Sequence, residues 1–457
     1  MSVVEPMQWL ILEPLDDPDR LMFVQAKPGA KFKYRKKNYT VGAVVGAPYG
    51  SVFELVKRGI QLVDVAALAT VEDIRRSGEL AAAAAHKAGA TSSDNRNLVD
   101  NNTAQKLNQT DVQAMKDSGA SAAEIVSSLV ANSSTFHAKT EFSQAKYIKK
   151  KQKQYAPTFR VVPCCMQTIV DTMHFKDTRR ICGLRSDGAA QLLARGNVRA
   201  SGKVIVVDCA MGLIVGGAAE RMMGNGSIVN FILGDHPSVS MLPRFNLPEN
   251  VEQGVVHFPF NSLRMLTESM ERKKKGRKMK EDEEDEEEEE EEEDFAFESW
   301  QPSRHIASIT QTCEILSPHG ADSFVAVVAE QYHALHVLKA ILPLLSSGAS
   351  FAIFCPFIEP LKEAAEYVKN KKVAVDVALT QLWVRQFQVL PGRTRPNMNM
   401  DDGAGYLLSG VLTHSAANTL GTGTAEKVGN MKNSSSSSSS SSSTISESEP
   451  PAKRLKR

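Results

Sequence analysis

The residues with the clearest chemical meaning are Asp208, Ala210, Gly212 and Ile214, which follow an apolar run at residues 204–207. A buried strand that enters a helix through a tight turn is where nucleotide-cofactor folds place a glycine-rich loop. Glycine occupies alternate turn positions because the backbone approaches the cofactor there and a Cβ would collide with it. Ala210 and Ile214 leave only one of the three expected glycines. The pattern predicts a methyltransferase-like domain whose degenerate loop holds no cofactor.

The elements around this turn alternate between strands and helices. Apolar, β-branched or aromatic runs predict strands over 204–207, 227–233, 324–329 and 351–354, and helices are expected over 334–345 and 361–368. This alternation predicts a Rossmann-like, doubly wound α/β sheet of the S-adenosylmethionine-methyltransferase type, formed by residues 158–267 and 301–414. Residues 268–300 carry a basic block and an acidic run that are too polar to pack, so we expect a disordered insertion.

The first part of the chain has a different pattern. Short apolar runs separated by turn residues are typical of a small antiparallel barrel or sandwich, and we expect a β-barrel over residues 1–75. Residues 76–96 are predicted to be a flexible insert, and residues 97–157 a basic helical connector with capping patterns at two helix starts. Residues 415–457 form a serine-rich tail that we expect to be disordered.

Charge points to a polyanionic partner. Residues 281–294 are all acidic, and removing these 14 from the 53 acidic residues leaves 39 against 54 basic residues, a net charge of +15. Such a surplus favours nucleic acid, although charge spread for solubility is the alternative. No apolar run is long enough to span a bilayer, so no membrane partner is expected. The six cysteines show no zinc-finger spacing and are expected to be reduced thiols.

Other motifs narrow the function further. The segment 146–155 carries five lysines and two tyrosines, which suits phosphate contacts and base stacking, although a solvated helix end is the alternative. The pair His333 and His336 lacks a third ligand nearby, so packing is favoured and no metal site is predicted. Metalloprotease, serine-hydrolase and P-loop motifs are absent from the sequence. The terminal cluster of Lys453, Arg454, Lys456 and Arg457 predicts a nuclear localisation signal, with a general nucleic-acid-binding tail as the alternative.

Several segments together resemble one family. They are NRNLVD at 95–100, TAQKL at 103–107, KTEF at 139–142, KYIKKK at 146–151 and WVRQFQVLP at 383–391. The chain resembles the non-catalytic subunit of the eukaryotic tRNA (adenine-58-N1)-methyltransferase from its N-terminal domain to GYLLSG at 405–410, apart from the insertion and the tails.

The resemblance implies a heterotetramer of two such subunits with two catalytic subunits, which bind S-adenosylmethionine and form m1A58 in the tRNA T-loop. This chain would help to bind the tRNA, and the terminal basic cluster predicts that the complex is nuclear. The tRNA-binding positions that the resemblance implies are Asn95, Arg96, Gln105, Lys146, Tyr147, Lys149, Lys150, Lys151, Lys153, Tyr155, Lys176, Arg179, Arg180, Arg304, Lys369, Lys371, Lys372, Gln388, Arg393 and Arg395.

The function expected from these observations is tRNA binding and complex assembly without catalysis. Two alternatives stay open. One is an active methyltransferase that uses its own unusual loop, which Ala210 and Ile214 disfavour. The other is a nuclear RNA-binding or translation-initiation-related scaffold with no role in methylation.

Overall fold

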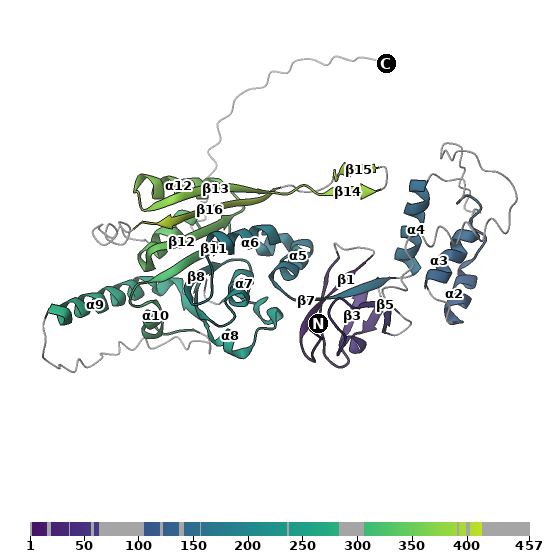
Figure 1. Cartoon of the computed structure of the whole chain (residues 1–457), viewed down its shortest axis with the longest axis horizontal. Helices are drawn as coiled ribbons and strands as arrows, with labels where there is room; N and C mark the ends of the chain where they lie inside the picture. Colours follow the sequence, from purple (N-terminus) through teal and green to yellow (C-terminus); the bar gives the residue numbers. More distant parts are fainter. Residues whose placement is uncertain are drawn as a thin grey trace, which may run out of the picture.

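The computed structural model describes residues 2–15, 20–35, 37–55, 59–63, 105–118, 122–136, 141–155, 157–234, 237–282, 306–390, 393–398 and 403–413. The predictions for the insert at 76–96, for the insertion beyond residue 282 and for the terminal tail lie outside these residues. Figure 1 shows a C-terminal α/β domain beside an N-terminal sheet, with a group of helices at the outer end of that sheet.

The C-terminal domain is built on a seven-stranded mixed sheet, which confirms the predicted Rossmann-like fold. The strand order is β10-β9-β8-β11-β12-β16-β13. The parallel strands β8 to β12 meet β16, which runs antiparallel to both β12 and β13. The bounds are β8 (Gly202–Asp208), β9 (Gly226–Ile232), β10 (Val255–Pro259), β11 (Ala321–Val327), β12 (Leu345–Cys355), β13 (Ala374–Trp383) and β16 (Gly403–Leu412).

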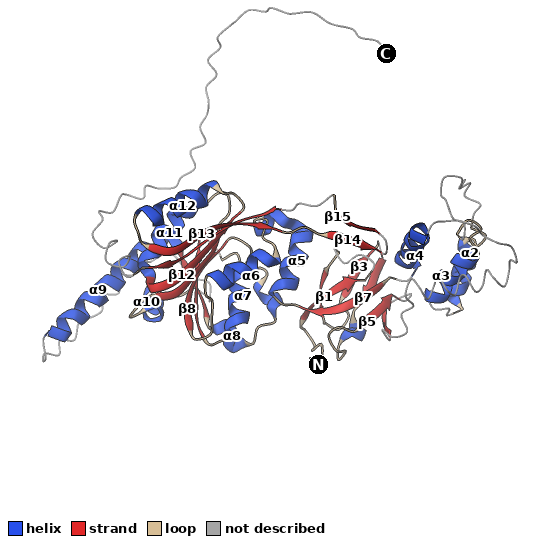
Figure 2. Ribbon diagram, turned by 45° about the horizontal axis from the view of Figure 1, so that its top comes forward, coloured by secondary structure: helices blue, strands red, loops and turns tan. Residues whose placement is uncertain are grey.

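Helices cover both faces of this sheet, as Figure 2 shows. One face packs against α5 (Met166–Asp177), α6 (Ser186–Arg195) and α7 (Leu213–Met222), with α8 (Glu249–Gln253) beside them. The other packs against α9 (Leu263–Asp282), α10 (Ile309–Leu316), α11 (Ala334–Ile341) and α12 (Glu359–Asn370). Because both faces are covered, the central strands carry continuous apolar runs, such as the fully buried run from Val204 to Val207. Helix α9 continues to Asp282, so the segment predicted to be disordered from residue 268 begins as a helix.

The N-terminal domain is an open antiparallel sheet, so the predicted barrel is not confirmed. Its strand order is β2-β1-β7-β5-β6, and a separate hairpin, β3-β4, packs beside it. In the part of the chain that the structure describes, the edge strands β2 and β6 do not pair with each other. The bounds are β1 (Trp9–Pro14), β2 (Met22–Gln25), β3 (Lys31–Tyr34), β4 (Lys37–Thr40), β5 (Val52–Leu55), β6 (Ile60–Val63) and β7 (Thr158–Pro163).

Strand β7 corrects the predicted domain boundary at residue 158. It lies between β1 and β5, with Ile11 opposite Val162 and Phe53 opposite Phe159. Phe159 is buried against the rings of Phe32 and Tyr34. The strand therefore completes the N-terminal core, and the α/β domain begins after it.

The segment predicted to be a helical connector contains helices in its described part. They are α2 (Gln109–Asp117), α3 (Ala122–Ala131) and α4 (Glu141–Tyr155), inserted between β6 and β7. Val126, Val130, Phe136 and Ile148 form a small buried cluster that holds α4 against α3. The insertion thus packs on a core of its own at one end of the N-terminal sheet (Figure 1).

Candidate nucleic-acid interface and a closed cofactor turn

The turn after β8 is held by the carboxylate of Asp208. Its Oδ1 accepts a hydrogen bond from the amide of Ala210 at 2.6 Å, and its Oδ2 accepts from the amides of Ile214 at 2.7 Å and Val215 at 3.1 Å. Burial raises the pKa of the Asp208 carboxyl, and the backbone amides that donate to it oppose that shift. The amides at the start of α7, which in a cofactor fold bind phosphate or carboxylate groups, already donate within the protein.

A neighbouring segment also covers the turn. Gly212 has φ +84°, and a Cβ built on it would lie 2.8 Å from the Cα of Val239. The amide of Met241 donates to the carbonyl of Met211 at 3.0 Å. Ala210 and Ile214, the residues in place of glycines, are fully buried. The residues present therefore do not fit a cofactor at this turn, because its donors are used and its one glycine is covered by protein backbone.

Replacing Asp208 with alanine is expected to lower the free energy of unfolding by about 3 kcal/mol or more, since three amide donors on buried residues lose their acceptor. Denaturant unfolding of the purified chain measures this. The matched control is Glu314→Ala on the exposed side of α10, for which we expect a change within about 0.5 kcal/mol. Equal effects of the two substitutions would contradict the role assigned to Asp208.

Helix α4 presents two of its predicted RNA contacts to solvent. Lys146 and Lys150 are exposed and lie four residues apart, so they share one face of the helix. The side chains of Lys149 and Lys153 lie outside the described part of the chain. Lys146 and Lys150 therefore give α4 a cationic face that can contact phosphates.

The two tyrosines of α4 are less available for base stacking than the sequence indicates. The Tyr147 ring packs edge-on against Phe136 with 5.5 Å between centroids, and Gln105 Nε2 donates to its hydroxyl at 3.2 Å. Lys151 Nζ lies 5.4 Å from the Tyr147 ring centroid and 5.7 Å from that of Tyr155. These contacts place Gln105, Tyr147, Lys151 and Tyr155 in the packing that fixes α4.

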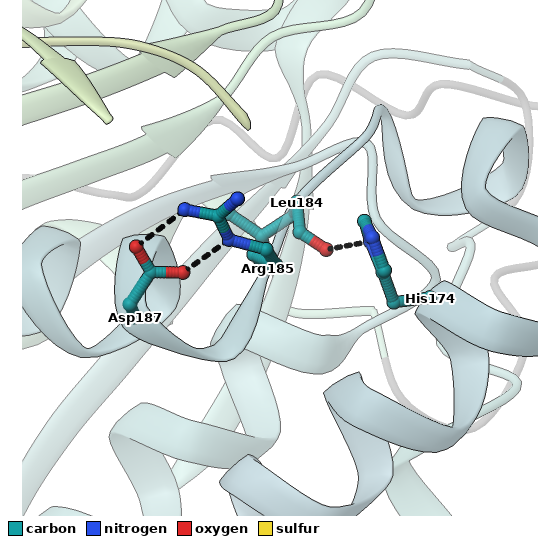
Figure 3. A network of polar contacts seen from close by, with 4 residues as sticks. All are labelled: His174, Leu184, Arg185 and Asp187. Atoms are coloured by element: carbon teal, nitrogen blue, oxygen red, sulfur yellow. Dashed lines mark hydrogen bonds and ion pairs between the residues drawn. The ribbon is translucent and has the colours of Figure 1, made fainter. Parts of the chain in front are cut away.

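A second cationic group lies at the end of α5, in the 3-10 turn η4 (Thr178–Ile181). Lys176, Arg179 and Arg180 are exposed, and Arg180 pairs with Asp177 at 3.1 Å. Figure 3 shows the contacts next to this turn: His174 Nδ1 lies 3.3 Å from the carbonyl of Leu184, and Arg185 forms two bonds to Asp187.

Arg185 holds the pKa of the Asp187 carboxyl below its usual range. The charge of Arg185 is thus neutralised within the fold, whereas Lys176 and Arg179 form no ion pair with a carboxylate among the described residues.

The hairpin of β14 (Phe387–Leu390) and β15 (Arg393–Pro396) carries the third group. Arg395 is exposed, and its Nη2 donates to Gln388 Oε1 at 3.5 Å. The side chain of Arg393 lies outside the described residues. The hairpin leaves the C-terminal sheet and extends over the N-terminal sheet toward α4 in both views (Figures 1 and 2).

Sheet topology divides the predicted contacts between two edges. Because β12 and β13 both run antiparallel to β16, β13 ends at the carboxyl edge of the parallel strands, and the hairpin lies there. Turn η4 lies at the same edge, since Cys182 Sγ is 3.6 Å from the carbonyl of Cys209, directly after β8. Lys369, Lys371 and Lys372 are exposed but precede β13, so they lie at the opposite edge, about 30 Å away along the strand.

The remaining predicted positions lie outside the described residues: Asn95, Arg96, Arg304, and the terminal Lys453, Arg454, Lys456 and Arg457. His333 Nε2 contacts Glu363 at 3.3 Å, and its ring lies 5.1 Å from that of His336. Within the described ranges, no group of three potential metal ligands comes together. Among these same residues, no helix combines the length and apolar character needed to cross a membrane.

Exposed apolar side chains accompany the hairpin, and the sequence reasoning did not identify them. Trp383 is 60% exposed at the end of β13, Phe387 is 55% exposed and Val389 is 74% exposed on β14. Strand β13 is also the last strand of its sheet. Large apolar side chains gathered on an edge strand and hairpin are typical of a protein interface. The β-branched and aromatic residues interspersed among polar ones at 383–389 were the signal in the sequence that could have indicated this surface.

Comparison with known proteins adds independent information. The model of the Gcd10p family matches residues 3–294. The tRNA (adenine(58)-N(1))-methyltransferase non-catalytic subunit trm6 of Dictyostelium discoideum is 32% identical over 423 residues, covering 90% of this chain and 79% of that protein. The protein of the same description from Mus musculus is 29% identical over 440 residues, covering 85% and 84%.

Two solved structures are similar to the chain at low sequence identity. A SAM-dependent O-methyltransferase from Thermotoga maritima has a TM-score of 0.46 and 9% identity, covering 90% of this chain and 95% of that one. The tRNA (m1A58) methyltransferase TrmI from Aquifex aeolicus has a TM-score of 0.40 and 10% identity, covering 90% and 99%.

Proposed function

The chain belongs to the Gcd10p family, and from this premise we propose that it is the non-catalytic subunit of a tRNA (adenine-58-N1)-methyltransferase. The observation that carries the proposal is the closed turn after β8. Asp208 occupies the amides at the start of α7, and Val239 covers Gly212. S-adenosylmethionine would then be bound by the catalytic partner, which would carry out the methyl transfer.

The role of this chain in the reaction is to hold tRNA. The N1 edge of a T-loop adenosine must leave its tertiary contacts before it can be methylated, and a protein that grips the RNA body favours that exposed state. Phosphate contacts fix the position of a bound RNA without reading its sequence. Support comes from the exposed cations Lys146 and Lys150 on α4, Lys176 and Arg179 near η4, and Arg395 on the hairpin.

Assembly with the catalytic subunit would use the apolar surface of Trp383, Phe387 and Val389. These side chains are exposed in the single chain, and burying them would remove a large apolar area from water. We propose a heterotetramer of two copies of this chain with two catalytic subunits. The basic cluster at Lys453, Arg454, Lys456 and Arg457 supports a nuclear location for the complex.

The experiment that tests this function is methyl transfer to tRNA by this chain, by the catalytic subunit and by the two together. The proposed role requires that only the mixture is active.

A further inference from the structure

One short segment of the α/β domain, residues 239–246, contacts both the turn after β8 and the N-terminal sheet. Its Asn246 makes a reciprocal pair of hydrogen bonds with the backbone of Trp9 in β1: the Trp9 amide donates to Oδ1 at 2.7 Å, and Nδ2 donates to the Trp9 carbonyl at 2.8 Å. The Arg244 guanidinium lies 4.9 Å from the Trp9 ring centroid and 4.6 Å from that of Phe23. The Arg244 guanidinium therefore contacts two aromatic rings of the N-terminal sheet, beside Ile11 of β1, which is buried in the core of the α/β domain.

The other end of the same segment is anchored on the closed turn. Val239 packs on Gly212, and the Met241 amide donates to the Met211 carbonyl at 3.0 Å. Met241 Sδ in turn accepts a hydrogen bond from Arg244 Nη1 at 2.7 Å. Contacts thus run without interruption from the turn after β8, through residues 239–246, to the first strand of the N-terminal sheet.

Arg244 is fixed by the rings more than by hydrogen bonds. Its Nε is buried and has no hydrogen-bond partner among the described residues. Burial lowers the pKa of the guanidinium, which remains charged at neutral pH because arginine begins from a very high value. A partly buried cation over two aromatic rings is attracted to both by cation–π interaction, and removing the guanidinium would leave both rings without that partner.

We propose that residues 239–246 form a joint that uses the closed cofactor turn as its anchor, and that Arg244 is a positioning residue for tRNA methylation. Strand β1 pairs with β7, and β7 follows α4 after two residues. The contacts at Trp9 therefore fix the orientation of the N-terminal sheet relative to the α/β domain. That orientation sets where Lys146 and Lys150 lie relative to Arg395 on the hairpin. Two cationic groups on separate bodies bind one RNA more tightly when their spacing is fixed beforehand, because less ordering is needed on binding. The effect on tRNA rests on the proposed function, whereas the joint itself does not.

The first test is Arg244→Ala in the full chain complexed with its catalytic partner. We expect the KM for tRNA to rise about ten-fold while kcat and the KM for S-adenosylmethionine stay within about two-fold, because positioning of the RNA is lost and the chemistry is not. Arg244→Lys keeps a cation over the rings and is expected to restore part of the loss. Arg221→Ala, at an exposed arginine of α7, is the matched control.

The second test measures the joint directly, without RNA. Spin labels on non-natural residues at the exposed positions Gln61 and Glu366 report the distance between the two domains and leave the native cysteines unlabelled. Arg244→Ala and Asn246→Ala are expected to broaden the distance distribution. Gly212→Ala touches neither the sheet nor Arg244, yet it should broaden the distribution as well, because its Cβ displaces Val239.

The outcomes separate the joint from the proposed function. Unchanged distance distributions in Arg244→Ala and Asn246→Ala would overturn the joint, and a change in these two but not in Gly212→Ala would overturn its anchoring on the turn. Broadened distributions with an unchanged KM for tRNA would keep the joint and overturn Arg244 as a positioning residue. A fall in kcat equal to that of kcat/KM, without rescue by Arg244→Lys, would also overturn the positioning role.

Discussion

Replacing Lys146 and Lys150 together with alanine is expected to weaken tRNA binding by the complex at least about ten-fold near 0.1 M salt and to lower the slope of log Kd against log salt by about two. Both side chains are exposed on one face of α4, and each can release one counterion on contact with a phosphate. Filter binding at four salt concentrations measures both quantities.

The matched control for this experiment removes two other exposed cations, Lys362 on α12 and Arg221 on α7. This variant has the same change in net charge, so a general loss of electrostatic attraction would affect both variants equally. Equal loss in the two double variants would contradict a defined interface on α4. Adding Arg395→Ala to the α4 variant should lower the slope by about one more unit, because the hairpin would contact the same tRNA.

The second large effect concerns assembly. The double replacement of Trp383 and Phe387 with alanine is expected to weaken binding to the catalytic subunit by about 100-fold or more, since aromatic anchors of an interface are often worth about 2 kcal/mol each. Biolayer interferometry between the two purified subunits measures the affinity. Because both side chains are more than half exposed, the fold of the single chain should be unaffected.

Leu62→Ala is the control for an exposed apolar residue away from this surface, since Leu62 is 57% exposed on β6. Its affinity for the catalytic subunit should equal that of the unaltered chain. If the Trp383 and Phe387 variant also retained full affinity, the hairpin surface would not be the assembly interface.

Local patterns in the sequence predicted the α/β domain well. The run from Val204 to Val207 is entirely buried, and the turn after it lies where the spacing of Asp208, Ala210 and Gly212 indicated. Alternation of apolar runs also predicted the later strands, because each element of a doubly wound sheet carries its own signal. The prediction of disorder from polar composition was wrong at residues 268–282, where α9 continues although the segment is highly charged.

Long-range pairing could not be predicted in this way. Strand β7 has the alternation of a half-buried strand, yet its partners β1 and β5 lie more than a hundred residues earlier in the chain. The strand pairing in the structure identifies these partners, and the local pattern does not. The cover that Val239 forms over Gly212 is equally non-local. The tyrosines of α4 were predicted to be stacking surfaces because composition does not show that Tyr147 packs against Phe136.

The sequence predicted the candidate interface as a set of charges and not as an arrangement in space. Lys146, Lys150, Lys176 and Arg395 are exposed, as a phosphate-binding role requires. The sequence could not indicate that Lys369, Lys371 and Lys372 lie at the opposite edge of the sheet, since that depends on the direction of β13.

The most direct test of the central claim is methyl transfer from labelled S-adenosylmethionine to tRNA, measured with this chain alone, with its catalytic partner alone and with both coexpressed. The closed turn at Asp208 and Gly212 predicts that only the mixture is active and that this chain alone retains no labelled cofactor on a filter. Methyl transfer by this chain alone would contradict the account and would place the catalytic site within it.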